Sequence, residues 1–174
     1  TEKLDGSSVT YFVKDGEFGV CSRNLELLES AENSLWKVAK DLKIEEKLKS
    51  LYGNFAIQGE IIGEGIQGNL YKLRGQSVHF FNVFDIDKYT FLGFIPFQET
   101  MKKLGLQTVP IVETDFLLSN EIQALVEKSK AKSVLNPNVW REGIVIRTLI
   151  EKQDTELGRV SFKAINPEFL LKYE

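Results

Sequence analysis

Cysteine and histidine are almost absent from this sequence. Cys21 is the single cysteine and His79 the single histidine among 174 residues. One cysteine excludes an internal disulfide, which fits a reducing compartment. We interpret His79, which stands in an aromatic stretch, as a structural or surface residue rather than a metal ligand.

Long hydrophobic runs and a dominant charge sign are also missing. No apolar run reaches the length that a membrane-spanning helix needs, and the chain opens without a signal-peptide pattern. Lys and Arg number 22 against 25 Asp and Glu, which gives a net charge of −3. A surface that binds a polyanion must therefore be local, with acidic residues gathered elsewhere. We expect a cytoplasmic protein without a membrane partner.

The residues that are present indicate one globular domain over 1–174. Hydrophobic residues make up 43% and charged residues 27% of the chain, and the length suffices for one core. The mixture of strands and helices, with hairpin links, predicts an α+β fold with mainly antiparallel sheets and flanking helices. Periodicity and turn residues predict strands at 8–12, 18–22, 55–62, 78–86, 108–112, 143–150 and 159–165, and helices at 33–51 (with a break at Lys43-Ile44), 98–104, 119–130 and from 167 onward.

Two glycine-containing turns have different meanings. Asp15-Gly16 lies between two apolar runs and predicts a tight hairpin. The segment 63–68 matches the glycine pattern of dinucleotide-binding loops, but a lone match is weak. Because 69–73 does not read as a helix, no helix N-terminus would receive a pyrophosphate. We therefore interpret 63–68 as a glycine-rich hairpin loop.

The first residues of the chain contain a candidate nucleophile, Lys3, in the sequence Glu2-Lys3-Leu4-Asp5-Gly6. In an extended segment Asp5 projects to the same side as Lys3, and Gly6 permits a sharp turn or a close approach to a ligand. A lysine amine in such a setting can act as a covalent nucleophile. A solvated lysine in a surface turn is the alternative, and on these five residues alone it is favoured.

Two further polar residues stand at strands. Glu60 points opposite to Ile57 and Gly59 in the alternation of its strand. It lies at the sheet surface or accepts hydrogen bonds from ribose hydroxyls. Arg23 ends the second strand and offers a planar fork for phosphate, although an exposed arginine at a strand end is common.

Three later motifs complete the set of candidates. The aromatic stretch 79–86 is mostly core, but one face can present Phe84 to a purine. Glu142 and Gly143 stand at the mouth of an apolar strand, a position for a hard metal ion or an ordinary charged strand entry. Lys163 lies in a late strand that we expect to be buried, where a phosphate would pair its charge.

The order of these motifs resembles the covalent nucleotidyltransferase superfamily of polynucleotide ligases and mRNA capping enzymes. The details are most similar to ATP-dependent RNA ligases, through Ser-Arg-Asn at 22–24, Gln-Gly-Glu at 58–60 and the loop 65–69. The resemblance runs from Glu2 to about Tyr173. It implies a nucleotidyltransferase catalytic domain of the ATP-grasp-like type, with an accessory nucleic-acid-binding domain outside this chain.

The resemblance also implies a reaction. Lys3 would attack the α-phosphorus of ATP, form lysyl-AMP and release pyrophosphate. AMP would then pass to a 5′-phosphate in nicked or broken RNA, possibly in an RNA/DNA hybrid, and a 3′-hydroxyl would displace it. We expect Mg²⁺ or Mn²⁺ as the metal and a monomeric protein.

By the same resemblance, residue roles can be assigned. Lys3, Asp5 and Lys163 would be catalytic, and Glu142 would bind the metal. Arg23 would contact phosphate, Glu60 the ribose and Phe84 the adenine. The full set expected at the nucleotide is Glu2, Lys3, Leu4, Arg23, Glu60, Phe84, Glu142 and Lys163.

One departure from the family pattern and several alternatives stay open. Many ligases carry a second lysine two positions after the first in the last motif, where this sequence has Ile165. A DNA ligase or a capping guanylyltransferase of the same superfamily is the nearest alternative. A non-catalytic nucleotide- or RNA-binding module is the alternative from another class.

Overall fold

Alternating apolar residues build the larger of two sheets in the computed structural model, which describes residues 1–173. This sheet has five strands in the order β3-β2-β4-β5-β6, and every neighbouring pair is antiparallel. The predicted α+β fold with antiparallel sheets is thereby confirmed. The strands are β2 (Ser7–Lys14), β3 (Glu17–Cys21), β4 (Phe55–Gly63), β5 (Gln76–Asp85) and β6 (Thr90–Phe91).

Local turn chemistry sets the register of this sheet. Asp15 and Gly16 both have positive φ, 52° and 84°, as the predicted two-residue hairpin between β2 and β3 requires. Between β4 and β5 the register shifts, so that Gln58 pairs with Asn82 while Gly59 pairs with Phe80. The extra residue in β5 is a β-bulge, which bends the strand.

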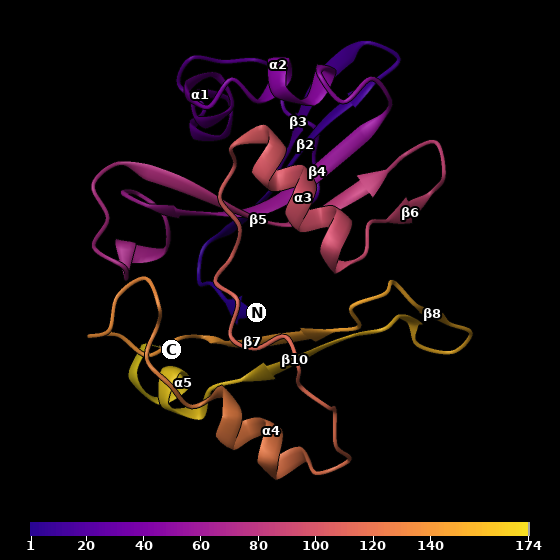
Figure 1. The fold of residues 1–174 in the computed structure, drawn as a ribbon. Helices are drawn as coiled ribbons and strands as arrows, with labels where there is room; N and C mark the ends of the chain where they lie inside the picture. The colour runs from indigo at the N-terminus through magenta and orange to yellow at the C-terminus, as the bar shows by residue number, and fades with distance from the viewer. Residues whose placement is uncertain (174) are drawn as a thin grey trace.

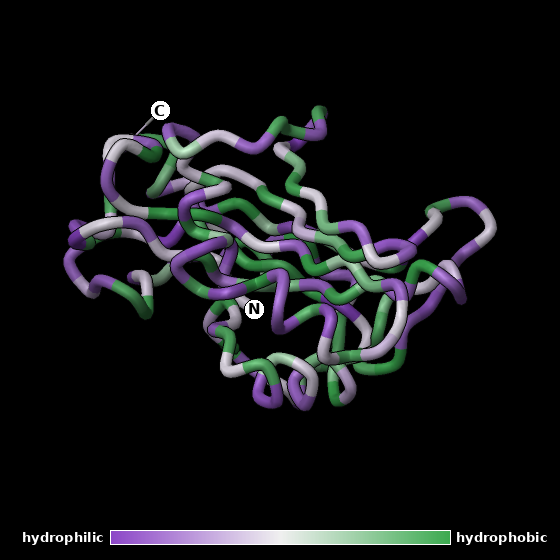
Figure 2. The backbone as a smooth tube through the Cα atoms, turned by 90° about the horizontal axis from the view of Figure 1, so that it is seen from above, coloured by the Kyte–Doolittle hydropathy of each residue, from purple (hydrophilic) through white to green (hydrophobic). Residues whose placement is uncertain are grey.

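One face of the large sheet carries the main hydrophobic core. Val9, Ile57 and Phe80 are fully buried there. Three helices supply the other side of this core: α1 (Ser34–Asp41), α2 (Ile44–Lys49) and α3 (Phe94–Leu104). Figure 1 shows these helices against the large sheet, and Figure 2 shows apolar residues concentrated along the strands.

The break predicted near residue 43 separates α1 from α2. Lys43 has a left-handed backbone conformation, with φ 53°, which an α-helix cannot contain. At the start of α1, the Asn33 side chain accepts hydrogen bonds from the backbone amides of Leu35 and Trp36 at 2.9 and 3.3 Å. This N-cap satisfies two of the amides that a helix start leaves unpaired.

A smaller sheet joins the two ends of the chain. It has the order β1-β7-β10, with β1 (Glu2–Lys3), β7 (Gly143–Arg147) and β10 (Ser161–Ile165). Its strands lie below the large sheet in Figure 1, with α4 (Ile122–Ser129) and α5 (Pro167–Tyr173) on the far side. Two short strands, β8 (Gln153–Asp154) and β9 (Gly158–Arg159), form a hairpin between β7 and β10.

The predicted strand at 108–112 is wrong. The segment makes a single parallel bridge, Phe80 to Thr108, and then leaves the large sheet. Proline cannot donate to a ladder, and the Pro110 carbonyl instead accepts a hydrogen bond from the Glu2 amide at 2.8 Å. The segment therefore links the two sheets rather than extending one of them.

Smaller differences concern the ends of elements. α3 begins four residues before the predicted position, α4 begins at Ile122 without a side-chain cap, and β7 ends at Arg147. The glycine-rich segment 63–68 begins at the end of β4 and belongs to the loop between β4 and β5, as the hairpin-loop interpretation predicts, and it overlaps the short 3₁₀ helix η1 (Gln67–Asn69). Within residues 1–173, none of the helices is both long and apolar enough to cross a membrane.

Candidate active site

Lys3 lies where the small sheet begins, and its side chain forms an ion pair with Glu142. Lys3 pairs with Gly143 in the ladder between β1 and β7, which places Glu142 next to it although 139 residues separate the two in sequence. Nζ of Lys3 donates to Oε1 of Glu142. Both side chains are mostly buried, with exposed fractions of 23% and 15%. Such a pair is screened less by solvent than a surface pair.

Gly143 permits the close spacing of β7 and β10 beside this pair. A Cβ atom at this position would lie 2.3 Å from the carbonyl oxygen of Ala164, a contact that no side chain can make. Only glycine fits without moving one of the strands. The glycine that follows the predicted metal carboxylate therefore has a packing reason.

Glu60 faces the Lys3–Glu142 pair from the large sheet. Burial raises the pKa of Glu60 to about 7, against an ordinary value of 4.5. The positive charges of Lys3 and Arg23 act in the opposite direction, while Glu142 and Asp5 raise this pKa further. These five charged residues from four distant segments therefore lie within electrostatic range of one another.

Glu2 and Leu4, which flank Lys3, have buried side chains. Oε2 of Glu2 accepts a hydrogen bond from the Val134 amide at 2.9 Å, and Leu4 belongs to a second hydrophobic cluster with Tyr71. Successive residues of a strand point to opposite faces. The structure therefore brings the backbones of Glu2 and Leu4, rather than their side chains, to the Lys3 side of the sheet.

Asp5 follows this strand and is held by its backbone. Its amide donates a hydrogen bond to the Tyr71 hydroxyl at 2.7 Å. Burial raises the pKa of Tyr71 well above its usual value, so this hydroxyl stays protonated. The chain direction after Lys3 is thereby fixed between the two sheets.

Lys163 shares a face of the small sheet with Lys3. Lys163 pairs with Val145, and Ile165 pairs with Gly143, which in turn pairs with Lys3. Residues directly opposite each other in a ladder project to the same face. The prediction that Lys163 is buried is wrong, because its side chain is exposed on this small, partly covered sheet. Ile165 lies in the same row of the sheet as Lys3 and two positions from Lys163 in β10.

Phe84 and Arg23 lie at the periphery of the group of charged residues around Lys3. Phe84 pairs with Ala56 and therefore shares a face with Glu60, but it stands farther along the strands. Its ring packs at a steep angle against Tyr89 and Phe91, with centroid distances of 5.4 and 4.9 Å. Arg23 is exposed in the turn after β3.

A family model described as RNA ligase matches residues 1–165. The chain belongs to the RNA ligase family. Solved structures agree: Naegleria gruberi RNA ligase with PPi has 43% sequence identity and a TM-score of 0.90, and 99% of this chain is covered. Two lysine-to-alanine mutants of that ligase, each with ATP and Mn, have the same identity and coverage, with TM-scores of 0.90 and 0.91.

The same ligase as a lysine-to-methionine mutant with AMP and Mn also matches at 43% identity and a TM-score of 0.90. In each case the chain spans 50% of the length of the solved structure. No curated protein matches the chain in sequence. The structural likeness confirms the predicted nucleotidyltransferase architecture.

Sequence reasoning missed a polar network in this RNA ligase family member. Arg159 donates to both carboxylate oxygens of Glu151, at 2.7 and 2.9 Å, and to Oδ1 of Asn82 at 2.8 Å. Asn82 in turn donates to Oε1 of Gln58 at 2.8 Å. Glu151 precedes β8 and Arg159 belongs to β9, and no periodic pattern in the sequence marks either residue. The burial of the Arg159 side chain, which reveals the network, is visible only in the structure.

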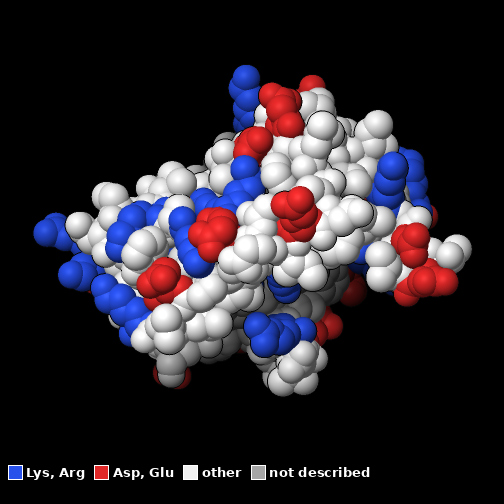
Figure 3. Space-filling view, turned by 90° about the horizontal axis from the view of Figure 1, so that it is seen from below, with Lys and Arg blue, Asp and Glu red and all other residues white. Residues whose placement is uncertain are grey.

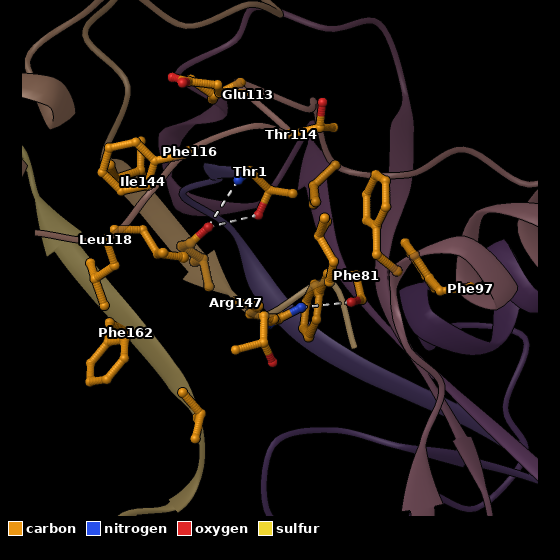
Figure 4. A pocket seen from close by; sticks show the side chains of 18 of the residues that line it. Thr1, Phe81, Phe97, Glu113, Thr114, Phe116, Leu118, Ile144, Arg147 and Phe162 are labelled. Carbon is orange, nitrogen blue, oxygen red and sulfur yellow. Dashed lines mark hydrogen bonds between the residues drawn. The ribbon is translucent and has the colours of Figure 1, made fainter. Parts of the chain in front are cut away.

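A cavity of about 620 Å³ lies beside the site, between α3, the segment 112–118 and β7. Figure 4 shows aromatic rings around it, with Thr1 donating to the Val145 carbonyl and Arg147 donating to the Phe81 carbonyl. Burial lowers the pKa of Arg147 to about 10. Among residues 1–173, the lining includes none of the predicted site residues, so the cavity lies next to the Lys3 group and does not contain it.

Proposed function

We propose that this chain is the adenylyl-transferring region of an ATP-dependent RNA ligase, with Lys3 as the nucleophile. Nζ of Lys3 forms a bond to the α-phosphorus of ATP, the bond to the β-phosphate oxygen breaks, and pyrophosphate leaves. The observation that carries this proposal is the Lys3–Glu142 pair facing Glu60 across the two sheets. A covalent step of this kind divides a difficult joining reaction into easier ones.

The ion pair between Lys3 and Glu142 is the form of the nucleophile in this structure. An ammonium group has no lone pair on nitrogen, so a paired Lys3 must lose a proton before it attacks phosphorus. Glu142 also suits a hard divalent cation, because Mg²⁺ in proteins uses one or two carboxylates together with substrate phosphates. Among residues 1–173, no group of three or more acidic, His or Cys side chains lies at one potential metal position.

Bound there, Mg²⁺ or Mn²⁺ would supply charge neutralisation for the phosphates of ATP. Glu142 would hold the cation, and repulsion from that positive charge would favour the neutral amine of Lys3. Solved structures of the Naegleria gruberi RNA ligase with ATP and Mn support this use of metal.

The remaining predicted residues fit contacts to the nucleotide. In this proposal Glu60 accepts hydrogen bonds from ribose hydroxyls, and Phe84 contacts the base. The shared face of the two residues on the large sheet supports these roles. Lys163 and Arg23 supply positive charge for phosphate, and Asp5 orients the sugar or the leaving group. Preorganised charges are the main means by which proteins accelerate phosphoryl transfer.

The second half of the proposal is the sealing of RNA. AMP passes from Lys3 to a 5′-phosphate, and a 3′-hydroxyl of nicked or broken RNA displaces it. The match to the RNA ligase family supports RNA over DNA as the substrate. Figure 3 shows lysine and arginine most numerous toward one end of the face seen from below, with acidic residues among them. A monomeric, cytoplasmic protein stays a prediction.

Covalent labelling tests the first step. Wild-type protein incubated with Mg²⁺ and ATP labelled on the α-phosphate should retain label through denaturation, and label on the γ-phosphate should be lost with pyrophosphate. Lys3→Ala should abolish labelling. Lys3→Arg keeps the charge and a partner for Glu142 but lacks the nucleophile, so it should also stay unlabelled.

Three outcomes separate the alternatives. Undiminished labelling of Lys3→Ala would contradict the assignment of the nucleophile. Labelling by GTP in preference to ATP would point to a guanylyltransferase. Reversible ATP binding by a wild type that never labels would support a non-catalytic binding module. Sealing of nicks with RNA or DNA at the 3′-hydroxyl then separates RNA from DNA ligase.

A further inference from the structure

Four side chains form a hydrogen-bonded chain across the face of the large sheet that carries Glu60. The chain runs from Glu151 through Arg159 and Asn82 to Gln58, with donor–acceptor distances between 2.7 and 2.9 Å. Arg159 also lies over the ring of Phe91, with its guanidinium carbon 3.8 Å from the ring centroid. The exposed fractions of the Arg159 and Glu151 side chains are only 18% and 15%.

The direction of every hydrogen bond in this chain is determined. A guanidinium group has only donors, so the oxygen of the Asn82 amide must face Arg159. The NH₂ group of Asn82 then faces Gln58, and the Gln58 oxygen must accept from it. The Gln58 NH₂ group is therefore the free end of the chain, and it is a donor. Glu151 fixes this order because its carboxylate holds Arg159 with two bonds.

The free end opens toward the nucleotide face. Among residues 1–173, no hydrogen bond from Nε2 of Gln58 is formed, and the one buried side-chain polar atom without a partner is Oε1 of Glu2. Nε2 of Gln58 is therefore accessible. Gln58 points to the same face as Glu60, because the two residues are two positions apart in β4.

The position of Gln58 lies between the two predicted nucleoside contacts. Gln58 is two residues from Glu60 in β4, about 7 Å along the strand. Its partner Asn82 is two residues from Phe84 in β5. A nucleoside with its ribose at Glu60 and its base at Phe84 must therefore cross the Gln58–Asn82 pair.

We propose that Nε2 of Gln58 donates a hydrogen bond to a ring nitrogen of adenine, and that Asn82, Arg159 and Glu151 set the polarity of that donor. This inference rests on the proposed ATP site and adds a specificity-determining residue to it. Adenine offers three acceptor nitrogens, N1, N3 and N7, and the amide can meet one of them. Asn82, Arg159 and Glu151 are positioning residues, since they act through Gln58.

Deaza analogues of ATP test the direct contact. Each of 1-deaza-, 3-deaza- and 7-deaza-ATP replaces one acceptor nitrogen by C–H. The rate of self-labelling at low nucleotide concentration should fall about tenfold for one analogue with wild-type protein, the effect of one lost hydrogen bond of about 1.4 kcal/mol. Gln58→Met keeps the shape of the side chain without the donor. Its rate of self-labelling with ATP should fall by a similar factor, and replacing ATP by the sensitive analogue should not lower that rate further.

Reversal of the polarity tests the relay. In Asn82→Asp the side chain has only acceptors, so Gln58 must turn its NH₂ group toward it and present its oxygen to the base. An oxygen repels a ring nitrogen but tolerates C–H, so this variant should use the sensitive analogue at least as well as ATP. If the network had a purely structural role, Asn82→Asp would lower the rate of self-labelling equally with ATP and with the three deaza analogues.

Several results decide the matter. If Gln58→Met keeps the wild-type pattern of losses, or if Asn82→Asp keeps the wild-type preference for ATP, the inference is overturned. Gln58→Glu provides a second variant should Gln58→Met not fold, because it preserves the bond from Asn82 and presents an oxygen. Gln123→Met, on the exposed surface of α4, is the matched control and should behave as wild type.

Failure of this inference is distinguishable from failure of the proposed function. A wild type that never labels with ATP contradicts the proposed function itself. A wild type that labels through Lys3, without any dependence of analogue use on Gln58, contradicts the base contact alone.

Discussion

The two sheets of this protein are assembled in different ways. In the five-stranded sheet hairpins join β2 to β3, β4 to β5 and β5 to β6, and the sheet has a continuous apolar core under three helices. The three-stranded sheet joins Glu2–Lys3 to strands more than a hundred residues later, and a smaller cluster around Leu4 and Tyr71 supports it. Contacts that are local in sequence cost less loop-closure entropy than distant ones.

This difference separates recognition from chemistry. The large sheet carries Glu60, Gln58 and Phe84, the residues that we assign to the ribose and base. The small sheet carries Lys3 and Lys163, next to Glu142, the groups that we assign to phosphorus. The proposed nucleoside site therefore lies on a sheet with a large core. The proposed reacting groups lie on a sheet that forms only when segments distant in sequence pair with each other. Changes in the two sheets should have different effects.

Removal of a large side chain from the main core should have the largest effect on stability. Phe80 is fully buried in the large sheet, and Phe80→Ala should lower the free energy of unfolding by about 3–5 kcal/mol. Val109→Ala, in the smaller cluster, should cost about 2 kcal/mol. Urea unfolding followed by circular dichroism measures both. Equal costs would contradict the ranking of the two cores.

Loss of the carboxylate beside Lys3 should affect labelling more than stability. Glu142→Gln removes the anionic partner of Lys3 and the proposed metal ligand, so the rate of self-labelling should fall by about 100-fold, typical for one preorganised electrostatic group. Glu127→Gln, an exposed carboxylate paired with Lys130 near the end of α4, is the control. A full rate for Glu142→Gln at ordinary Mg²⁺ would remove it from the metal site.

A steric change can disturb the small sheet without removing any chemical group. Gly143→Ala places a Cβ atom 2.3 Å from the Ala164 carbonyl oxygen, so β7 and β10 must separate. We expect a loss of about 1–3 kcal/mol in unfolding free energy, together with slower labelling because Lys3 and Lys163 lose alignment. Val145→Ala keeps the backbone spacing and serves as the control. Normal labelling by Gly143→Ala would show that strand spacing is unimportant.

The titration of Glu60 should make the stability of the protein depend on pH. Because burial raises its pKa from 4.5 to about 7, the folded protein binds this proton more tightly than the unfolded chain does. The stability of wild type relative to Glu60→Gln should therefore decrease as pH rises from about 4.5 to about 7, and level off above. Urea midpoints of the two proteins across this range measure it. A difference that grows with pH would contradict a buried, destabilised carboxylate.

Much of the large sheet could be predicted from the sequence because its signals are local. Asp15-Gly16 predicts its hairpin, and the alternation of Ile57, Gly59 and Glu60 predicts which side chain leaves the core. The strand assigned to 108–112 failed because apolar composition alone cannot show that Pro110 accepts from Glu2 in the other sheet. The buried setting expected for Lys163 failed because the cover of a short sheet depends on distant segments.

The family, the hairpins, the helix break at Lys43 and the candidate residues could all be predicted from residue types at short or fixed spacing. Which of the candidates meet became known from the folded structure. It paired Lys3 with Glu142 and placed Glu60 opposite them. It also ordered the amides of Gln58 and Asn82 through Arg159. Those arrangements depend on burial and on contacts between distant segments, which no local pattern encodes.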